Sequence, residues 1–304
     1  MHRSHILNTS CLDCIVNPMS MLTRIAYVLN YTLSRDIAGR TVAKFPDDTF
    51  LVAYPGSGGQ WLRRLIANVM DPEHPATDTN IFQRVPDLYH LSRRRFNSMA
   101  RPRVIFSHEC FDTDCHGRVV YLVRDPRDVA VSIYGQERRR RDITAPLTIE
   151  QFISTEFMAT ERHQGGWAED FSGAIEQNGG FTYLSRLKEE FLGTPASWGE
   201  NVMSWLGAHE VNSGSLLTVR YEDLFERPER VLETISDFLD LRFSGKKIRP
   251  AVAVSRAFQT SDWPSQPGQW EKALPSSSVN MIEAAWGELM VLLGYPVTVN
   301  RSRV

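Results

Sequence analysis

Residues 49–70 constrain the fold of this chain more than any other stretch. They begin with a short apolar run rich in β-forming residues, TFLVAY at positions 49–54, followed by a glycine-rich turn at positions 55–59. From Trp61 to Met70, apolar residues recur at helical spacing. A strand, a tight turn and a helix in this order predict an α/β fold in which the turn lies at the carboxyl end of a parallel strand.

Three further apolar runs fit the same architecture. Residues 104–106, 119–123 and 216–219 are expected to be strands, and VVYLV at 119–123 is typical of a central parallel strand. Helices are expected to begin near residue 128 and to span residues 227–241. This alternation predicts a single α/β domain around a central parallel sheet of about five strands flanked by helices.

Composition and charge limit the class of protein, its partners and its location. The chain has 304 residues, 42% of them hydrophobic, which suits a globular protein with a substantial core. Its net charge of -2 argues against a nucleic-acid partner. We expect residues 1–45 to form an N-terminal leader with one amphipathic helix, residues 19–33, packed on a domain of residues 46–304. Polar residues interrupt that helix, so we expect no membrane span and no secretory signal, and we expect a cytoplasmic location.

The cysteines and the arginine runs each allow two interpretations. Cys11 and Cys14 form a C-x-x-C pair that is far in sequence from the second pair, Cys110 and Cys115. We favour free thiols in a reducing cytosol over a metal site, because neither pair has the surroundings of a zinc ribbon. Arginine runs near residues 94 and 139 are solvated helix faces in the simpler interpretation, and entry patches for an anionic ligand in the other.

The turn after the first expected strand can bind an anion. Residues 54–61 read YPGSGGQW, and a glycine-rich turn between strand and helix presents backbone N–H groups at the positive end of the helix. The alternative is a tight turn that uses glycine for steric reasons alone. The segment is not a Walker A loop, because no Lys followed by Ser or Thr comes after its second glycine.

A second candidate site follows the apolar strand at residues 119–123. Arg124 is expected at the carboxyl edge of the sheet, where ligands bind in open α/β sheets, and its planar guanidinium suits a phosphate. Ser132, about two helical turns further on, adds a hydroxyl. In the alternative interpretation, Arg124 and Asp125 form a pair that caps a helix, and Ser132 is simply a small residue.

Together these segments resemble the nucleotide signatures of sulfotransferases that use 3′-phosphoadenosine 5′-phosphosulfate (PAPS). The family's first motif, Y-P-K-S-G-T-T-W, resembles residues 54–61, and its second, R-[DN]-P-[KR]-D-x-x-x-S-x-Y, matches residues 124–134 at every defined position. Residues 103–108, 197–205 and 219–224 resemble the family's strand ending in K-T-H, its S-W-x-x-[HN]-V-x-x-W segment and its Y-E-D-[LM] strand end. The resemblance extends over about residues 48–275 in the expected order.

The resemblance implies a fold similar to P-loop kinases, PAPS as co-substrate and no metal. It implies that His108 is the general base, because a histidine can take a proton near neutral pH. It also implies three groups of nucleotide contacts: the 5′-phosphosulfate with Ser57, Gly58, Gly59 and Gln60; the adenine with Trp61 and Tyr221; and the 3′-phosphate with Arg124 and Ser132.

The chain departs from the family pattern in two places. Gly56 stands where the first motif usually carries lysine, and no R-K-G precedes the G-x-W at residues 268–270. Arg63 is the candidate substitute for the lysine, with a surface position as the alternative, and Arg256 is the candidate for the missing 3′-phosphate ligand.

Two other functions compete with the transferase hypothesis, and the acceptor is a separate question. A P-loop kinase would need the absent G-K-[ST] and an acid for Mg²⁺, whereas a nucleotide-binding protein without transfer activity would fit the missing lysine. We expect a small hydroxylated acceptor (or an amine) bound by loops within residues 74–100, 135–195 and 255–275. Aromatic residues of the middle loop line that site or belong to the core: Trp167, Phe171, Phe181 and Tyr183.

Overall fold

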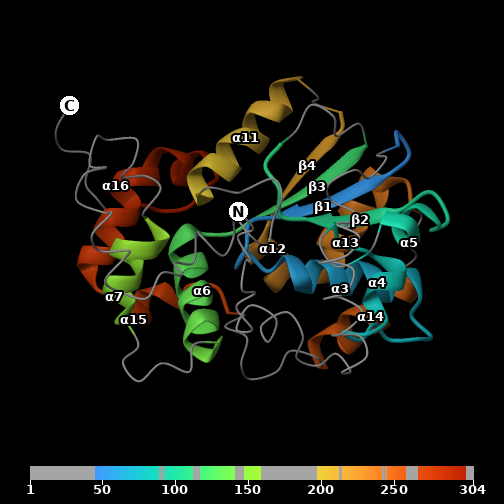
Figure 1. Cartoon of the computed structure of the whole chain (residues 1–304), viewed down its shortest axis with the longest axis horizontal. Coiled ribbons are helices and arrows are strands. Elements are labelled where there is room, and N and C mark those ends of the chain that lie inside the picture. Colours follow the sequence, from blue (N-terminus) through green and yellow to red (C-terminus); the bar gives the residue numbers. More distant parts are fainter. Residues whose placement is uncertain are drawn as a thin grey trace, which may run out of the picture.

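The computed structural model describes residues 45–88, 91, 93–111, 117–140, 147–158, 197–211, 214–241, 243, 245–257 and 266–298. Within them, four parallel strands form one sheet in the order β2-β1-β3-β4, as Figure 1 shows. The strands are β1 Thr49–Ala53, β2 Val104–Ser107, β3 Arg118–Val123 and β4 Leu216–Arg220. The α/β fold with a parallel sheet is thus confirmed, with four strands in the described ranges where about five were expected.

The sheet register brings the candidate site residues to one edge. Thr49 pairs with Val104 on one side and with Arg118 on the other, so the strands start and end nearly level. The chain passes from β1 to β2 on one side and then to β3 on the other. The crevice at such a reversal, outside the carboxyl ends of the strands, is where open α/β sheets bind ligands.

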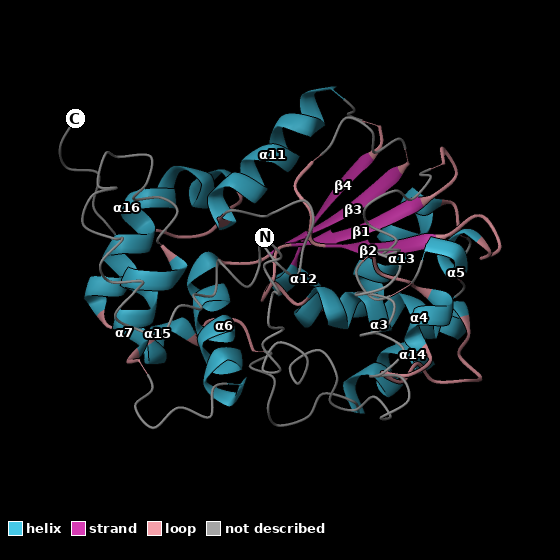
Figure 2. Ribbon diagram, viewed as in Figure 1, coloured by secondary structure: helices cyan, strands magenta, loops and turns pink. Residues whose placement is uncertain are grey.

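Helices cover both faces of the sheet, as Figure 2 shows. Alternate residues of β1 and β3 belong to different cores: Phe50 and Tyr121 pack on one side, and Leu51 and Val120 on the other. Because both faces are buried, these strands are apolar throughout. The helices are α3 Gly59–Met70, α4 Ile81–Arg84, α5 Arg93–Asn97, α6 Pro126–Arg140, α7 Ile149–Phe152, the π-helix η3 Ile153–Phe157, α11 Trp198–Val211, α12 Tyr221–Glu226, α13 Pro228–Leu239, α14 Gly245–Ala257, α15 Trp270–Ala273 and α16 Ser276–Leu292.

Several expectations fall outside the described residues. They concern the leader helix at residues 19–33, the C-x-x-C pair and Cys115, and the four aromatic residues between positions 167 and 183. The arginines of the two basic runs that are described, at positions 94, 95, 138 and 139, are exposed. No helix in the described part of the chain is both long enough and apolar enough to cross a membrane.

Candidate nucleotide site

The loop after β1 depends on two glycines with left-handed backbone. Gly56 has φ +81° and Gly58 has φ +89°, conformations that other residues rarely adopt. A side chain at Gly58 would overlap the ring of Tyr221. The Ser57 N–H donates to the carbonyl of Tyr54 at 3.0 Å, which closes the turn. The backbone and the neighbouring side chains therefore require glycine at both positions, and anion binding by this turn stays a prediction.

The N-terminus of α3 faces this loop with unpaired polar groups. By helix geometry, the first N–H groups of α3, those of Gly59 and Gln60 among them, have no acceptor within the helix. No acidic side chain lies in its first turn. Ser57 Oγ and Trp61 Nε1 are buried, and neither has a hydrogen-bond partner among the residues that the structure describes. Because buried polar groups are normally paired, these donors fit an anionic ligand at this position.

Arg124 and Tyr221 close the other side of the loop. Arg124 is 2% exposed, and its Nη1 donates to the Gly56 carbonyl at 3.3 Å. Its guanidinium carbon lies 4.3 Å from the centroid of the Tyr221 ring, which is 5.8 Å from the Trp61 ring. Burial raises the pKa of Tyr221 to about 12, so its phenol stays neutral. Residues that follow β3 and β4 thus meet at the loop that follows β1.

Ser132 and Gln60 lie at the margins of this cluster. Ser132 is buried in α6 and accepts a hydrogen bond from Gln136 Nε2 at 3.4 Å. Its neighbour Ile133 packs on the loop, because a Cβ at Gly56 would lie 2.8 Å from Ile133 Cγ1. Gln60 is exposed at the start of α3. The structure therefore places α6 beside the loop and leaves the ligand roles of Ser132 and Gln60 as predictions.

His108 follows β2 and is hydrogen-bonded to the strand that carries the loop. Its Nδ1 lies 2.6 Å from the carbonyl oxygen of Ala53, the last residue of β1. A carbonyl can only accept, so Nδ1 carries the proton in the neutral ring and Nε2 is the basic nitrogen. The ring of Phe106 packs edge-on against it, with centroids 4.8 Å apart. The backbone of β1 therefore sets both the tautomer and the orientation of this imidazole.

The hypothesis that Arg63 replaces the loop lysine is wrong, and so is its surface alternative. Arg63, a residue of α3, is 2% exposed; its Nε donates to the Val85 carbonyl at 2.7 Å and its Nη1 pairs with Asp87 at 3.0 Å. Its charge is already neutralised by a buried carboxylate. Arg256 is exposed and approaches the Phe225 carbonyl at 3.5 Å, so its role stays a prediction.

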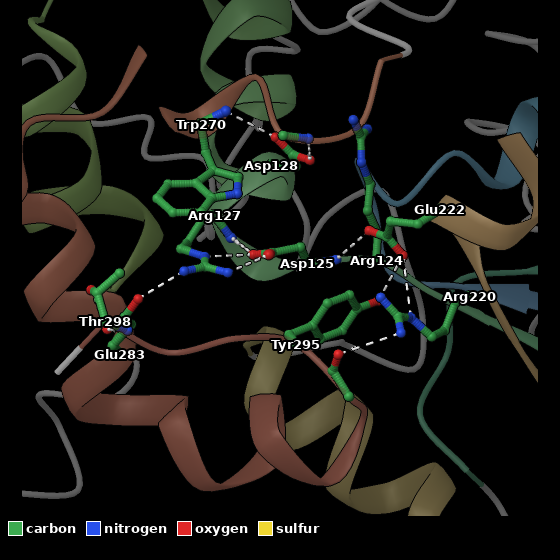
Figure 3. Close-up of polar contacts among 12 residues, drawn as sticks. Arg124, Asp125, Arg127, Asp128, Arg220, Glu222, Trp270, Glu283, Tyr295 and Thr298 are labelled. Carbon is green, nitrogen blue, oxygen red and sulfur yellow. Dashed lines mark hydrogen bonds and ion pairs between the residues drawn. The ribbon is translucent and has the colours of Figure 1, made fainter. Parts of the chain in front are cut away.

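Arg127, which the sequence did not single out, forms a buried ionic network with distant residues (Figure 3). Its Nε and Nη2 bind the two Asp125 oxygens at 3.0 and 2.6 Å, and its Nη1 binds Glu283 at 2.7 Å. Glu283 also accepts from the N–H and the hydroxyl of Thr298, each at 2.8 Å. Asp125 thus forms an ion pair with Arg127, whereas the alternative interpretation of the sequence placed this pair between Arg124 and Asp125.

The same segment is attached to the C-terminal region through two more carboxylates (Figure 3). Asp128 accepts from the backbone N–H groups of Gly268 and Trp270 at 2.7 and 3.0 Å. Glu222 accepts from the Asp125 N–H at 3.1 Å and from the Tyr295 hydroxyl at 3.0 Å. Burial raises the pKa of both carboxyl groups. Residues at the start of α6 are therefore hydrogen-bonded to residues that come much later in the chain.

Comparison with known proteins identifies the family. Residues 46–269 match the model of the sulfotransferase domain. The chain belongs to the sulfotransferase family. Sulfotransferase 2B1 of Rattus norvegicus is 29% identical over 201 residues, 58% of this chain and 58% of that relative. The 3-beta-hydroxysteroid sulfotransferase of Cavia porcellus is 25% identical over 229 residues, 72% of this chain and 65% of that relative.

These sulfotransferase matches cover less than two thirds of each of the two relatives. The crystal structure of mouse sulfotransferase SULT7A1 complexed with PAP superimposes with a TM-score of 0.60 at 18% identity, covering 84% of this chain and 89% of that chain. That likeness confirms the sulfotransferase fold. Within the described ranges, no group of three or more His, Cys, Asp and Glu residues is placed to hold a metal ion.

Proposed function

We propose that this chain is a PAPS-dependent sulfotransferase that transfers a sulfuryl group to a hydroxyl (or amine) of a small acceptor. The observation that carries the proposal is the meeting of Arg124, Tyr221 and the loop around the buried, unpartnered Ser57 hydroxyl. Membership of the sulfotransferase family supports it. The hydroxysteroid in the name of the Cavia porcellus relative supports an apolar, hydroxylated acceptor.

The described residues fit the nucleotide. When bound, PAPS supplies an activated sulfuryl group, and its transfer leaves 3′-phosphoadenosine 5′-phosphate (PAP). The N–H groups of Gly58, Gly59 and Gln60, at the positive end of α3, would hold the 5′ group and stabilise negative charge on its phosphate. The remaining contacts are proposed as the family resemblance implies. Ser57 would bind the 5′ group, Arg124 and Ser132 the 3′-phosphate, and Trp61 and Tyr221 the adenine.

His108 takes the proton of the acceptor in this proposal. Its hydrogen bond to the Ala53 carbonyl makes Nε2 the basic nitrogen, on the side of the ring away from β1. An imidazole titrates near neutral pH, so it can remove the acceptor proton as the oxygen attacks sulfur.

A nucleotide-binding protein without transfer activity is the second candidate. The left-handed Gly56 favours it, because the loop excludes the lysine that the resembling motif carries. Both candidates bind PAP, whereas a P-loop kinase would prefer ADP, which has no 3′-phosphate. Only the transferase would turn over PAPS with an acceptor.

Calorimetric titration with PAP, with ADP as the control ligand, tests the proposed site. We expect PAP to bind much more tightly than ADP. Arg124→Ala should reduce the difference in binding free energy between PAP and ADP by about 1.5–3 kcal/mol, the contribution of a charge-assisted hydrogen bond. Arg138→Ala, at an exposed position of α6, should bind both ligands like the wild type. Equal affinity of the wild type for PAP and ADP would contradict the proposal.

A further inference from the structure

Helix α11 contacts the ends of two strands that are not neighbours in the sheet. The Trp198 indole N–H donates to the Arg124 carbonyl at 3.1 Å, just past β3. The Trp205 indole N–H donates to the Glu109 carbonyl at 3.0 Å, just past β2. Because β1 lies between β2 and β3, α11 bridges the two segments that carry Arg124 and His108 (Figure 1).

The segment that carries His108 takes several of its hydrogen bonds from this helix. The carbonyl of Glu109 accepts from Trp205 and also from Asn201 Nδ2, at 3.4 Å. Two residues further on, the Phe111 N–H donates to Ser204 Oγ at 3.0 Å, and its ring packs edge-on against Trp205. Residues 109–111 are thus held by three side chains of one helix, one residue after the imidazole.

Asn201 is also hydrogen-bonded to the sheet. It is fully buried, and its Oδ1 accepts from the hydroxyl of Tyr121, a buried residue of β3, at 2.9 Å. Burial raises the pKa of Tyr121 well above its usual value, so the phenol remains a donor. A donor on Oδ1 directs Nδ2 toward the Glu109 carbonyl. The chain Tyr121–Asn201–Glu109 therefore connects the middle of β3 to the segment next to His108.

We infer that Asn201 is a positioning residue for His108, holding the segment after β2 so that the imidazole keeps its hydrogen bond to the Ala53 carbonyl. This inference rests on the proposed transfer reaction, in which His108 is the base. The nucleotide side of the edge is held by other side chains, those of Trp198 and of the Arg127 network. Loss of the Asn201 amide should therefore change the state of the imidazole and the turnover number while PAP affinity is kept.

The test is nitrogen-15 NMR of the histidine side chains in the full chain, with the His108 signals assigned by His108→Gln. Wild-type His108 should show the tautomer with the proton on Nδ1. Asn201→Ala should give a mixture of tautomers, and Tyr121→Phe should give a smaller change in the same direction. With PAPS and p-nitrophenol, kcat of Asn201→Ala should fall by about 10- to 100-fold, the scale of a small misplacement, with the KM for PAPS unchanged.

Asn68→Ala is the matched control. Asn68 is an equally buried asparagine in the other core, where its Nδ2 donates to Ser255 Oγ at 2.9 Å and its Oδ1 accepts from the Ala76 N–H at 2.6 Å. It should lower stability and leave the His108 signals unchanged. If Asn201→Ala fails to fold, the same NMR measurement of His108 is made on Tyr121→Phe and Asn201→His. His108 signals that match the Asn68→Ala control in every Asn201 and Tyr121 variant would overturn the inference, even where PAP binding upholds the proposed function.

Discussion

Placing lysine at position 56, as in the resembling sulfotransferase motif, should damage this loop. Gly56 has φ +81°, and a Cβ there would lie 2.8 Å from Ile133 Cγ1 and 3.3 Å from Val129 Cγ1. Left-handed backbone costs a non-glycine residue about 1–2 kcal/mol. Overpacking of a filled site costs about 1–3 kcal/mol more. Gly56→Lys and Gly56→Ala should therefore each lower the free energy of unfolding by about 2–5 kcal/mol.

Gly268 offers a matched control for the backbone contribution. Its φ is +80°, and a Cβ there would meet nothing within 4 Å. Gly268→Ala keeps the N–H that donates to Asp128, so it should cost only the backbone share, about 1–2 kcal/mol. Equilibrium urea unfolding of the variants measures each cost, and the difference between Gly56→Ala and Gly268→Ala isolates the contact with Ile133.

A double-mutant cycle tests the steric share directly. Ile133→Ala destabilises the core on its own, but in the Gly56→Ala background part of its cost should be offset because the clash is removed. If Gly56→Ala costs no more than Gly268→Ala, the contact with Ile133 does not matter. If Gly56→Lys is as stable as the wild type and turns over PAPS faster, the loop tolerates lysine. Backbone strain and the contact with Ile133 then do not exclude lysine at position 56.

Two further predictions concern the base and the ionic network. His108→Ala should keep PAP affinity and lower kcat by roughly 10²–10⁴-fold in an assay with labelled PAPS, whereas wild-type turnover would exclude the base role. Glu283→Gln removes the charge paired with Arg127 and should lower the free energy of unfolding by about 1–3 kcal/mol in urea. Glu288→Gln, exposed on the same helix, should have no effect, and equal stability of the two variants would show that the pair contributes nothing.

The strands could be predicted because their signal is local. A strand buried on both faces is apolar throughout, and the four observed strands lie within one or two residues of the predicted ones. The candidate nucleotide residues follow strand ends, so a parallel sheet brings them to one edge without any knowledge of the helices. Arg124, Tyr221 and the loop meet there as expected.

The supporting contacts could not be predicted because they join distant positions. Arg127 pairs with Glu283, which lies 156 residues later in the chain, and no periodicity of the sequence relates the two. Arg63 shows the same limit, because its proximity to the loop in sequence suggested a ligand whereas its side chain turns to Asp87. The segment at residues 197–205 matched a family pattern, but only the structure shows that Trp198, Asn201 and Trp205 hold two strand ends.

The last residue of β1 and the loop that follows it contact the other three strand ends. His108 after β2 donates to the Ala53 carbonyl, Arg124 after β3 donates to the Gly56 carbonyl, and Tyr221 after β4 packs on Gly58. β1 lies inside the sheet, so its loop is within reach of all three ends. A change of backbone at Gly56 would therefore shift the carbonyl that accepts from Arg124, the residue proposed to hold the 3′-phosphate. For this reason, Gly56→Ala should lose PAP affinity even at temperatures where it remains folded, whereas Gly268→Ala should not.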